Sequence, residues 1–144
     1  MLRETIPGFA VVDEDHVVLA GTRDLEPYQR ARLASSRVRV VASAVPADAL
    51  DTALDELRER VERVYLHVDL DVLDSSVGRA NPYSATGGSD LDRVLGVITA
   101  TFRRFSVVAA ALTAYDPRFD TSGAIAVAAR AIAAQIATHA ARQR

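Results

Sequence analysis

A cluster of acidic residues with one histidine follows an apolar run near the middle of the chain. Residues 64–74 read VYLHVDLDVLD, so Asp69, Asp71 and Asp74 lie close together in sequence. In an extended strand, alternation places His67, Asp69 and Asp71 on one face. Two carboxylates about 6–7 Å apart on one face repel each other unless a cation lies nearby. A divalent metal would satisfy both, because hard cations bind carboxylate oxygens.

The same carboxylates also have a purely structural interpretation. One could cap the turn that follows the strand, and the other could pair with Arg79 or Arg23. Arg23 could instead neutralise its neighbours Asp24 or Glu26. His67 could support one of the carboxylates through a hydrogen bond or pack as a core histidine beneath the next loop, and we favour the core position. The D-x-D spacing alone does not choose among these interpretations.

A stretch of 17 residues, 72–88, follows the acids and shows neither helical nor strand periodicity. It contains Gly78, Pro82, Gly87 and Gly88. A loop this long inside a compact domain is usually functional. Ligands bind beyond the carboxyl ends of the strands in open α/β sheets, so we expect Asp69 and Asp71 to face this loop, both partly buried.

Four apolar runs that could position these residues alternate with segments of helical periodicity. The strands are predicted at residues 17–21, 38–43, 64–71 and 105–113, and the helices at 26–35, from Pro46, from the cap Ser89, and at 123–144. Apolar residues at i, i+3, i+4 and i+7 mark the core faces of the last three helices. This alternation implies right-handed crossovers and a parallel sheet covered on both faces. The predicted fold class is α/β, with three α-β-α layers in a single domain over residues 1–144.

The composition excludes several other classes of protein. The 144 residues carry 17 basic and 19 acidic side chains, and this net charge of −2 excludes a strongly basic nucleic-acid binder. There is no cysteine, so disulfides, thiolate catalysis and cysteine zinc sites are excluded. All 17 basic residues are arginine, which excludes lysine chemistry. We find no signal peptide and no apolar run of about 18 residues, and we expect a cytoplasmic protein with no membrane partner.

Four ordered motifs resemble those of the ureohydrolase family, which includes arginase, agmatinase and formiminoglutamase. D-L-D-V-L-D at 69–74 and T-G-G at 86–88 resemble the family signature D-x-D-x-x-D-P, a loop and P-G-G-L. P-G-F at 7–9 and G-T-R-D-L-E-P at 21–27 resemble its upstream P-G-F and G-x-R-D-x-D-P. T-A-Y-D-P at 113–117 resembles its E-x-N-P turn.

The resemblance implies an arginase-like fold, of which this chain matches only the C-terminal half. Family enzymes bind a pair of Mn²⁺ ions, and two of the metal ligands fall on Asp69 and Asp71. The other ligands belong to G-G-D-H and D-A-H-x-D segments, and neither occurs in this sequence. His67 is then a candidate to support the ligands by hydrogen bonding, while His16 and His139 lie outside any matching motif and are expected at the surface.

Several positions depart from the family pattern and leave the substrate unidentified. The family carboxylate that holds a substrate guanidinium falls at Ala114, which disfavours arginine. Residues 79–84, R-A-N-P-Y-S, look more like formiminoglutamase-type members than arginase. The remaining candidates for substrate contact in the loops are Glu26, Asp74, Asn81 and Tyr83.

Two functions therefore remain open. The first is a Mn²⁺-dependent hydrolase of C–N bonds in a small-molecule amidine or guanidino compound, inactive as this chain alone because half of the ligands are absent. The second is a non-catalytic remnant or partner subunit that keeps the fold and a half metal site.

Family geometry also predicts a gap in the sheet. A strand of the missing N-terminal half would separate strand 17–21 from strand 64–71, leaving two pairs of strands and an empty slot. The slot would expose strand edges and the side chains of Leu19, Val64, Leu66 and Val68. The chain must pair these strands directly or fill the slot with another chain, so we expect a homo-oligomer or a marginally stable domain.

Overall fold

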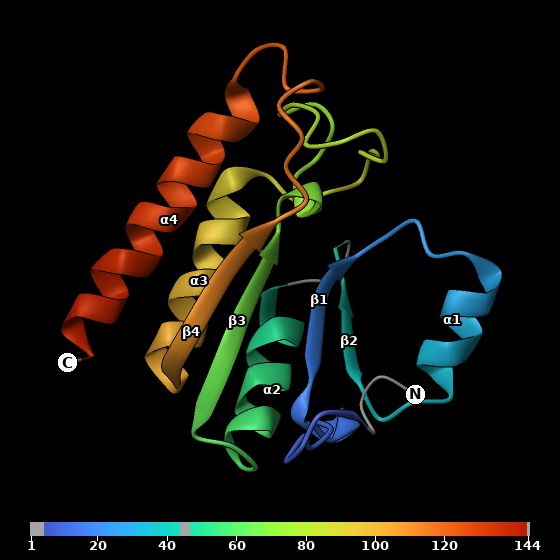
Figure 1. The fold of residues 1–144 in the computed structure, drawn as a ribbon, viewed down its shortest axis with the longest axis vertical. Helices are drawn as coiled ribbons and strands as arrows, with labels where there is room; N and C mark the ends of the chain where they lie inside the picture. Colours follow the sequence, from blue (N-terminus) through green and yellow to red (C-terminus); the bar gives the residue numbers. More distant parts are fainter. Residues whose placement is uncertain (1–4, 44–46, 144) are drawn as a thin grey trace.

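The computed structural model describes residues 5–43 and 47–143. In this part of the chain, strands and helices alternate as predicted (Figure 1). The strands are β1 (Val18–Thr22), β2 (Arg39–Ala42), β3 (Arg63–Asp69) and β4 (Ser106–Thr113). The helices are α1 (Pro27–Ala34), α2 (Ala47–Arg58), α3 (Leu91–Arg104) and α4 (Ala124–Arg142), with short 3-10 turns η2 (Glu14–His16) and η3 (Leu70–Val72).

Two predicted helix starts need comment. The predicted start of the second helix at Pro46 lies outside the described residues. The third helix is capped by Asp90, whose carboxylate accepts the N–H of Arg93 at 2.7 Å, and not by Ser89. Ser89 is buried instead and hydrogen-bonds through its backbone to Val72, which removes it from the capping position.

The predicted parallel sheet is present as two separate pairs. β1 pairs with β2 and β3 pairs with β4, both in parallel register. Figure 1 shows the pairs side by side with all strands pointing the same way. Among the described residues no strand ladder joins β1 to β3, so the split into two pairs is confirmed and direct pairing of these two strands is wrong.

Helix packing links the two pairs. α2 packs against β1, β2 and α3, and its Leu54 and Leu57 form a small core with Phe105. Val18 of β1 and Val64 of β3 both pack against this core. The strands are therefore held near each other through a shared helix, without hydrogen bonds between their backbones.

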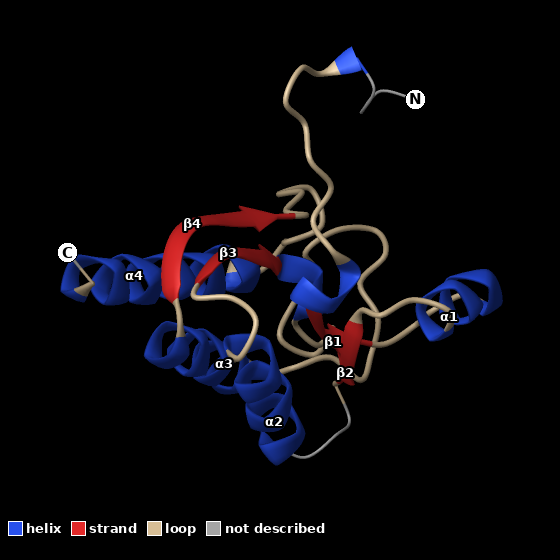
Figure 2. Cartoon of the chain, turned by 90° about the horizontal axis from the view of Figure 1, so that it is seen from below, coloured by secondary structure: helices blue, strands red, loops and turns tan. Residues whose placement is uncertain are grey.

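The main core lies between the β3–β4 pair and the helices α3 and α4 (Figure 2). Its largest fully buried side chains are Leu73, Ile98, Ile125 and Ile132. The predicted apolar faces of the helices supply this core, because residues three or four apart on a helix share one side. Burial of each of these side chains contributes about 1.5–3 kcal/mol.

α4 is long and apolar enough to cross a membrane by length and composition. A helix of a folded core passes the same test, so one such helix is weak evidence for a membrane span. Ile125, Ala128 and Ile132 of α4 are buried against α3 and the β3–β4 pair, which fits a packing helix.

The opposite face of the β3–β4 pair is uncovered. Tyr65 and Val108 are 58% and 60% exposed, and His67 and Ala110 are also exposed. On the side of the gap, Leu19 is exposed as predicted. The prediction was wrong for the other three slot residues: Val68 is buried, and Val64 and Leu66 are partly buried, because these side chains point toward the helices.

We predict that this uncovered face drives self-association of the chain. Val108→Lys should weaken association by about tenfold or more, because burying an ammonium group is costly. Val127→Lys is the matched control, since Val127 is 62% exposed on α4. Sedimentation equilibrium measures both variants, with urea unfolding as a check on folding. A wild-type chain that stays a monomer at high concentration and unfolds cooperatively would contradict this prediction.

Candidate functional site

Asp69 and Asp71 lie at the carboxyl end of β3. Asp69 is the last residue of the strand, and its Oδ1 accepts the N–H of Asp71 at 2.8 Å. This cap starts the 3-10 turn η3, so strand alternation stops at Asp69. The prediction that His67, Asp69 and Asp71 share one strand face is therefore wrong for Asp71, which the turn redirects.

The two carboxylates differ in burial. Asp71 is partly buried, as predicted, but Asp69 is exposed. Asp69 is exposed because it lies on the uncovered face of β3. Residues two apart in a strand share a face, and Tyr65 and His67 on this face are exposed as well. The sequence prediction of two partly buried acids assumed a covering layer that is absent from the described residues.

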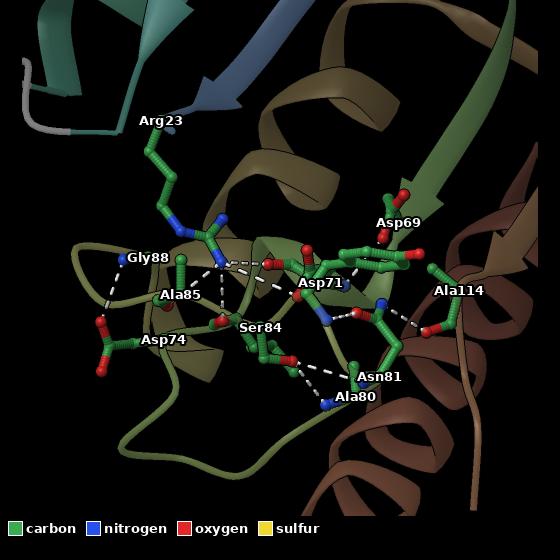
Figure 3. Close-up of polar contacts among 12 residues, drawn as sticks. Arg23, Asp69, Asp71, Asp74, Ala80, Asn81, Ser84, Ala85, Gly88 and Ala114 are labelled. Atoms are coloured by element: carbon green, nitrogen blue, oxygen red, sulfur yellow. Dashed lines mark hydrogen bonds and ion pairs between the residues drawn. The ribbon is translucent and has the colours of Figure 1, made fainter. Parts of the chain in front are cut away.

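Arg23 reaches the turn from the end of β1 (Figure 3). Its Nη2 donates to the backbone carbonyl oxygens of Asp71, of Leu73 at 3.4 Å and of Ala85 at 3.3 Å. The same nitrogen lies 4.0 Å from Asp71 Oδ1, which is an ion-pair contact beyond hydrogen-bond distance. The expected neutralisation of Asp24 or Glu26 by Arg23 is replaced by these contacts, because the side chain turns away from its neighbours in sequence.

The structural interpretation of the two acids accounts for most of these contacts. Asp69 caps the turn, and Asp71 lies beside Arg23. It leaves two atoms unexplained, because Asp71 Oδ1 and Arg23 Nε are both buried and have no hydrogen-bond partner in the described part of the chain. Buried polar atoms are normally paired. A carboxylate oxygen without a donor, close to the exposed carboxylate of Asp69, fits a ligand for a hard divalent cation.

Asp74 holds the ends of the long loop together. Its Oδ1 accepts the N–H of Ser76 at 2.8 Å and its Oδ2 accepts the N–H of Gly88 at 3.0 Å. The hydrogen bonds from Ser76, reinforced by Gly88, lower the pKa of Asp74 to about 2. A side chain on Gly88 would put its Cβ 2.6 Å from the backbone nitrogen of Asp74, so only glycine fits here.

Asn81 and Tyr83 border a shallow groove beside the end of β4. The groove has a volume of about 470 Å³ and is lined by residues 81–83 and 114–116. Asn81 Nδ2 donates to the carbonyl oxygen of Ala114 at 3.0 Å, and Asn81 Oδ1 accepts the N–H of Tyr83 at 2.8 Å. The Tyr83 side chain is left 81% exposed. Asn81 is therefore occupied by loop contacts, whereas Tyr83 is free to meet a ligand.

Ala114 has a positive φ of 64° at the carboxyl end of β4. This left-handed conformation is costly for a residue with a side chain and is common at functional sites. Asp24, with φ of 30°, lies two residues after the end of β1. Unusual backbone conformations thus follow two strands at the sheet edge that carries Asp69.

The other candidates occupy structural positions. Glu26 caps α1, and its N–H donates to Gln29 Oε1 at 2.9 Å. His67 is exposed and lies 2.7 Å from Thr113 Oγ1, so it is not a core histidine. His139 is partly buried and stacks on Phe102, with ring centroids 5.1 Å apart, so its predicted surface position is wrong in part.

One group of potential metal ligands was not predicted. Asp13, Asp15 and His16 have ligand atoms within 4.8 Å of one another in the described residues. They precede β1, at the opposite end of that strand from Arg23, so they cannot complete a site at Asp69. Exposed acidic groups of this kind are common without a metal.

Asp120 was also missed from the sequence. It is buried and accepts the N–H groups of Ile125 and Ala126 at the start of α4 and the hydroxyl of Tyr115 at 3.1 Å. Burial raises the pKa of this carboxyl, but the hydrogen bonds outweigh burial and hold the pKa below its usual value. An acid just before an alanine-rich helix is the signal that could have found it.

Comparison with protein families places these features in context. A model of the arginase family matches residues 2–139 of this chain. A formimidoylglutamase of Salmonella newport is 36% identical over 100 residues, which make up 69% of this chain and 32% of the relative.

Solved structures share the fold. They include arginase from Bacillus caldovelox (TM-score 0.78, 20% identity, 87% of this chain and 44% of that chain). Proclavaminate amidino hydrolase from Streptomyces clavuligerus gives a TM-score of 0.75 at 26% identity, over 92% of this chain and 45% of that one. Formimidoylglutamase from Bacillus subtilis gives a TM-score of 0.76 at 19% identity, over 91% of this chain and 42% of that one. The chain thus spans less than half the length of each of these proteins.

We predict that the loop held by Asp74 loosens in acid. A carboxyl whose pKa is lowered on folding stabilises the native state above its unfolded pKa of about 3.8 and loses that effect as the pH falls toward 2. Relative to the intrinsic exchange rate at each pH, the protection of the Ser76 and Gly88 amides should therefore fall between about pH 4 and pH 2. Asp74→Asn should lower this protection already at neutral pH, whereas Asp92→Asn, on α3, should not. Equal exchange in both variants would contradict this role.

We also predict that Ala114→Gly stabilises the chain. Glycine adopts a positive φ without steric cost, so the free energy of unfolding should rise by about 1 kcal/mol. Ala111→Gly, within β4, is the control and should lower it by about 0.5–1 kcal/mol. Urea unfolding monitored by circular dichroism measures both variants, and a loss of stability in the first would refute strain at this position.

Proposed function

The chain belongs to the arginase family, and we propose that it supplies the C-terminal half of a metal-dependent hydrolase of C–N bonds in linear amidines. The observation that carries this proposal is the buried, unpaired Oδ1 of Asp71 beside the exposed carboxylate of Asp69. Both acids stand at the carboxyl end of a parallel strand, where ligands bind in α/β sheets.

Asp69 and Asp71 would hold the metal, which we propose to be Mn²⁺ from the resemblance to the ureohydrolases. A divalent cation of this kind polarises its ligands and lowers the pKa of a bound water molecule. Two carboxylates are too few for a hard cation, which takes about six ligand atoms. The missing ligands must come from outside residues 1–144, since the G-G-D-H and D-A-H-x-D segments do not occur here.

The fold supports a partner segment at the same place. β1 and β3 are parallel to their partners and have no strand between them in the described residues, and one face of the β3–β4 pair is uncovered. The N-terminal half of the family fold, in the same polypeptide or in a second chain, would fill the gap between β1 and β3 and cover the open face of the β3–β4 pair. Self-association of this chain is the alternative way to bury the same surface.

The groove beside β4 supports our proposal for the substrate class. Ala114 offers no carboxylate for a guanidinium, so a formimino compound fits better than arginine. The 36% identity to a formimidoylglutamase supports the same substrate class. Tyr83, with its exposed side chain, would contact the substrate, while Asn81 in the groove wall and Asp74 would hold the loop that carries it.

A non-catalytic partner subunit is the second candidate function. The contacts of Asp69 as a turn cap and of Asp71 beside Arg23 favour it, because they give both acids a structural role without metal. A reading frame upstream of Met1 that encodes both missing ligand segments would favour the hydrolase instead.

We predict that the 144-residue chain binds Mn²⁺ weakly and has no turnover. Two carboxylates form an open site, so titration calorimetry should give an affinity weaker than micromolar. Asp71→Asn should abolish this binding, whereas Asp92→Asn should leave it unchanged. Sub-micromolar affinity, or product release from any formimino or guanidino compound, would contradict this prediction. Equal binding by both variants would refute the half site.

A further inference from the structure

Arg23 connects the two separate strand pairs at the end that carries the acids. It follows β1, and its guanidinium lies against η3 and the long loop after β3. Asp71 is 48 residues away in sequence and Ala85 is 62 residues away. One side chain therefore joins the end of the first pair to both ends of the loop that follows β3.

The contacts of Arg23 are those of a clamp. Its side chain is only 15% exposed. Its Nη2 donates to the carbonyl oxygens of Leu73, near the start of the loop, and of Ala85, near the end of the loop. The clamp is reinforced on both sides: Ser43 Oγ donates to the carbonyl oxygen of Gly87 at 2.9 Å. Gly21 lets Val72 approach so closely that a Cβ at position 21 would lie 2.7 Å from Val72 Cγ2.

Arg23 binds the backbone of Asp71 and leaves its carboxylate free. The guanidinium donates to the Asp71 carbonyl oxygen, while Oδ1 stays 4.0 Å away and accepts no hydrogen bond in the described chain. A cation that was merely neutralising Asp71 would be expected to donate to the carboxylate, often through two bonds. The observed arrangement fixes the turn and leaves the buried Asp71 Oδ1 without a hydrogen-bond donor among the described residues.

We propose that Arg23 is a positioning residue that holds the η3 turn so that Asp71 presents its carboxylate to a divalent cation. This inference rests on the proposed function. It assigns to Arg23 a role through the backbone of Asp71, with no contact to substrate or metal. All three hydrogen bonds come from Nη2. The lysine side chain is one bond shorter, so its ammonium nitrogen would not reach the position of Nη2.

The test compares Arg23→Gln and Arg23→Lys in the full chain. Arg30→Gln is the matched control, because Arg30 also donates to a backbone carbonyl, that of Leu25 at 3.3 Å, from an exposed position. Two measurements are made on each variant. Hydrogen exchange is measured for the amides of Asp74 and Ser89, which donate to the carbonyl oxygens of Ser89 and Val72 and so join the two ends of the loop. Amides of α3 and α4 are the reference for folding. Paramagnetic broadening by Mn²⁺ follows the ¹³C carboxyl signals of Asp69 and Asp71.

Arg23→Gln should accelerate exchange at both loop ends and raise the Mn²⁺ concentration for half broadening by about tenfold. Arg23→Lys should behave like Arg23→Gln, and Arg30→Gln like the wild type. Wild-type broadening in Arg23→Gln, or full restoration by lysine, would overturn the proposal, since charge alone would then suffice. If the wild type itself shows no broadening, the proposed metal site fails. In that case, hydrogen exchange tests whether Arg23 holds the turn and the loop. Unchanged exchange of the Asp74 and Ser89 amides in Arg23→Gln would overturn this role, and faster exchange would support it.

Discussion

The unpaired inner edges of β1 and β3 are the constraint on which the rest of the structure depends. Strand edges carry backbone N–H and C=O groups that need partners. In the described chain these edges have no strand between them, so two small sheets replace one. α2 joins them on the apolar side, through Leu54 and Leu57, and Arg23 joins them at the polar end. The hydrogen bond from Ser43 to Gly87 and the close approach of Gly21 to Val72 add to these links.

The same gap determines the state of the site. Asp69 is exposed because the face of β3 that carries it has no covering layer, and Asp71 is shielded because Arg23 and the loop cover it. The open sheet edge and the proposed metal ligands Asp69 and Asp71 thus lie at one place. This coincidence favours a domain that works together with further elements over one whose function is complete within these residues.

The loop after β3 is, by contrast, complete in itself. Asp74 binds both of its ends, Gly88 permits the close approach, and the bridge between Leu73 and Ser89 continues into α3. α3 and α4 then pack the core beneath it. A rigid loop on a firm core is suited to present Tyr83 and Ala114 to a small ligand, even where the neighbouring strand pair is loosely attached.

The sequence by itself determined the local structure and the family. Periodicity identified the order of strands and helices and the core faces around Ile98 and Ile132, because side-chain spacing reflects the geometry of each element. Only the tertiary structure decided how Asp71 leaves the strand face, where Arg23 points and which face of β3 stays open. These depend on a cap that starts a turn and on contacts between residues 48 to 62 positions apart. A single sequence carries no periodic signal for such distant contacts, since they arise only when the separate elements pack.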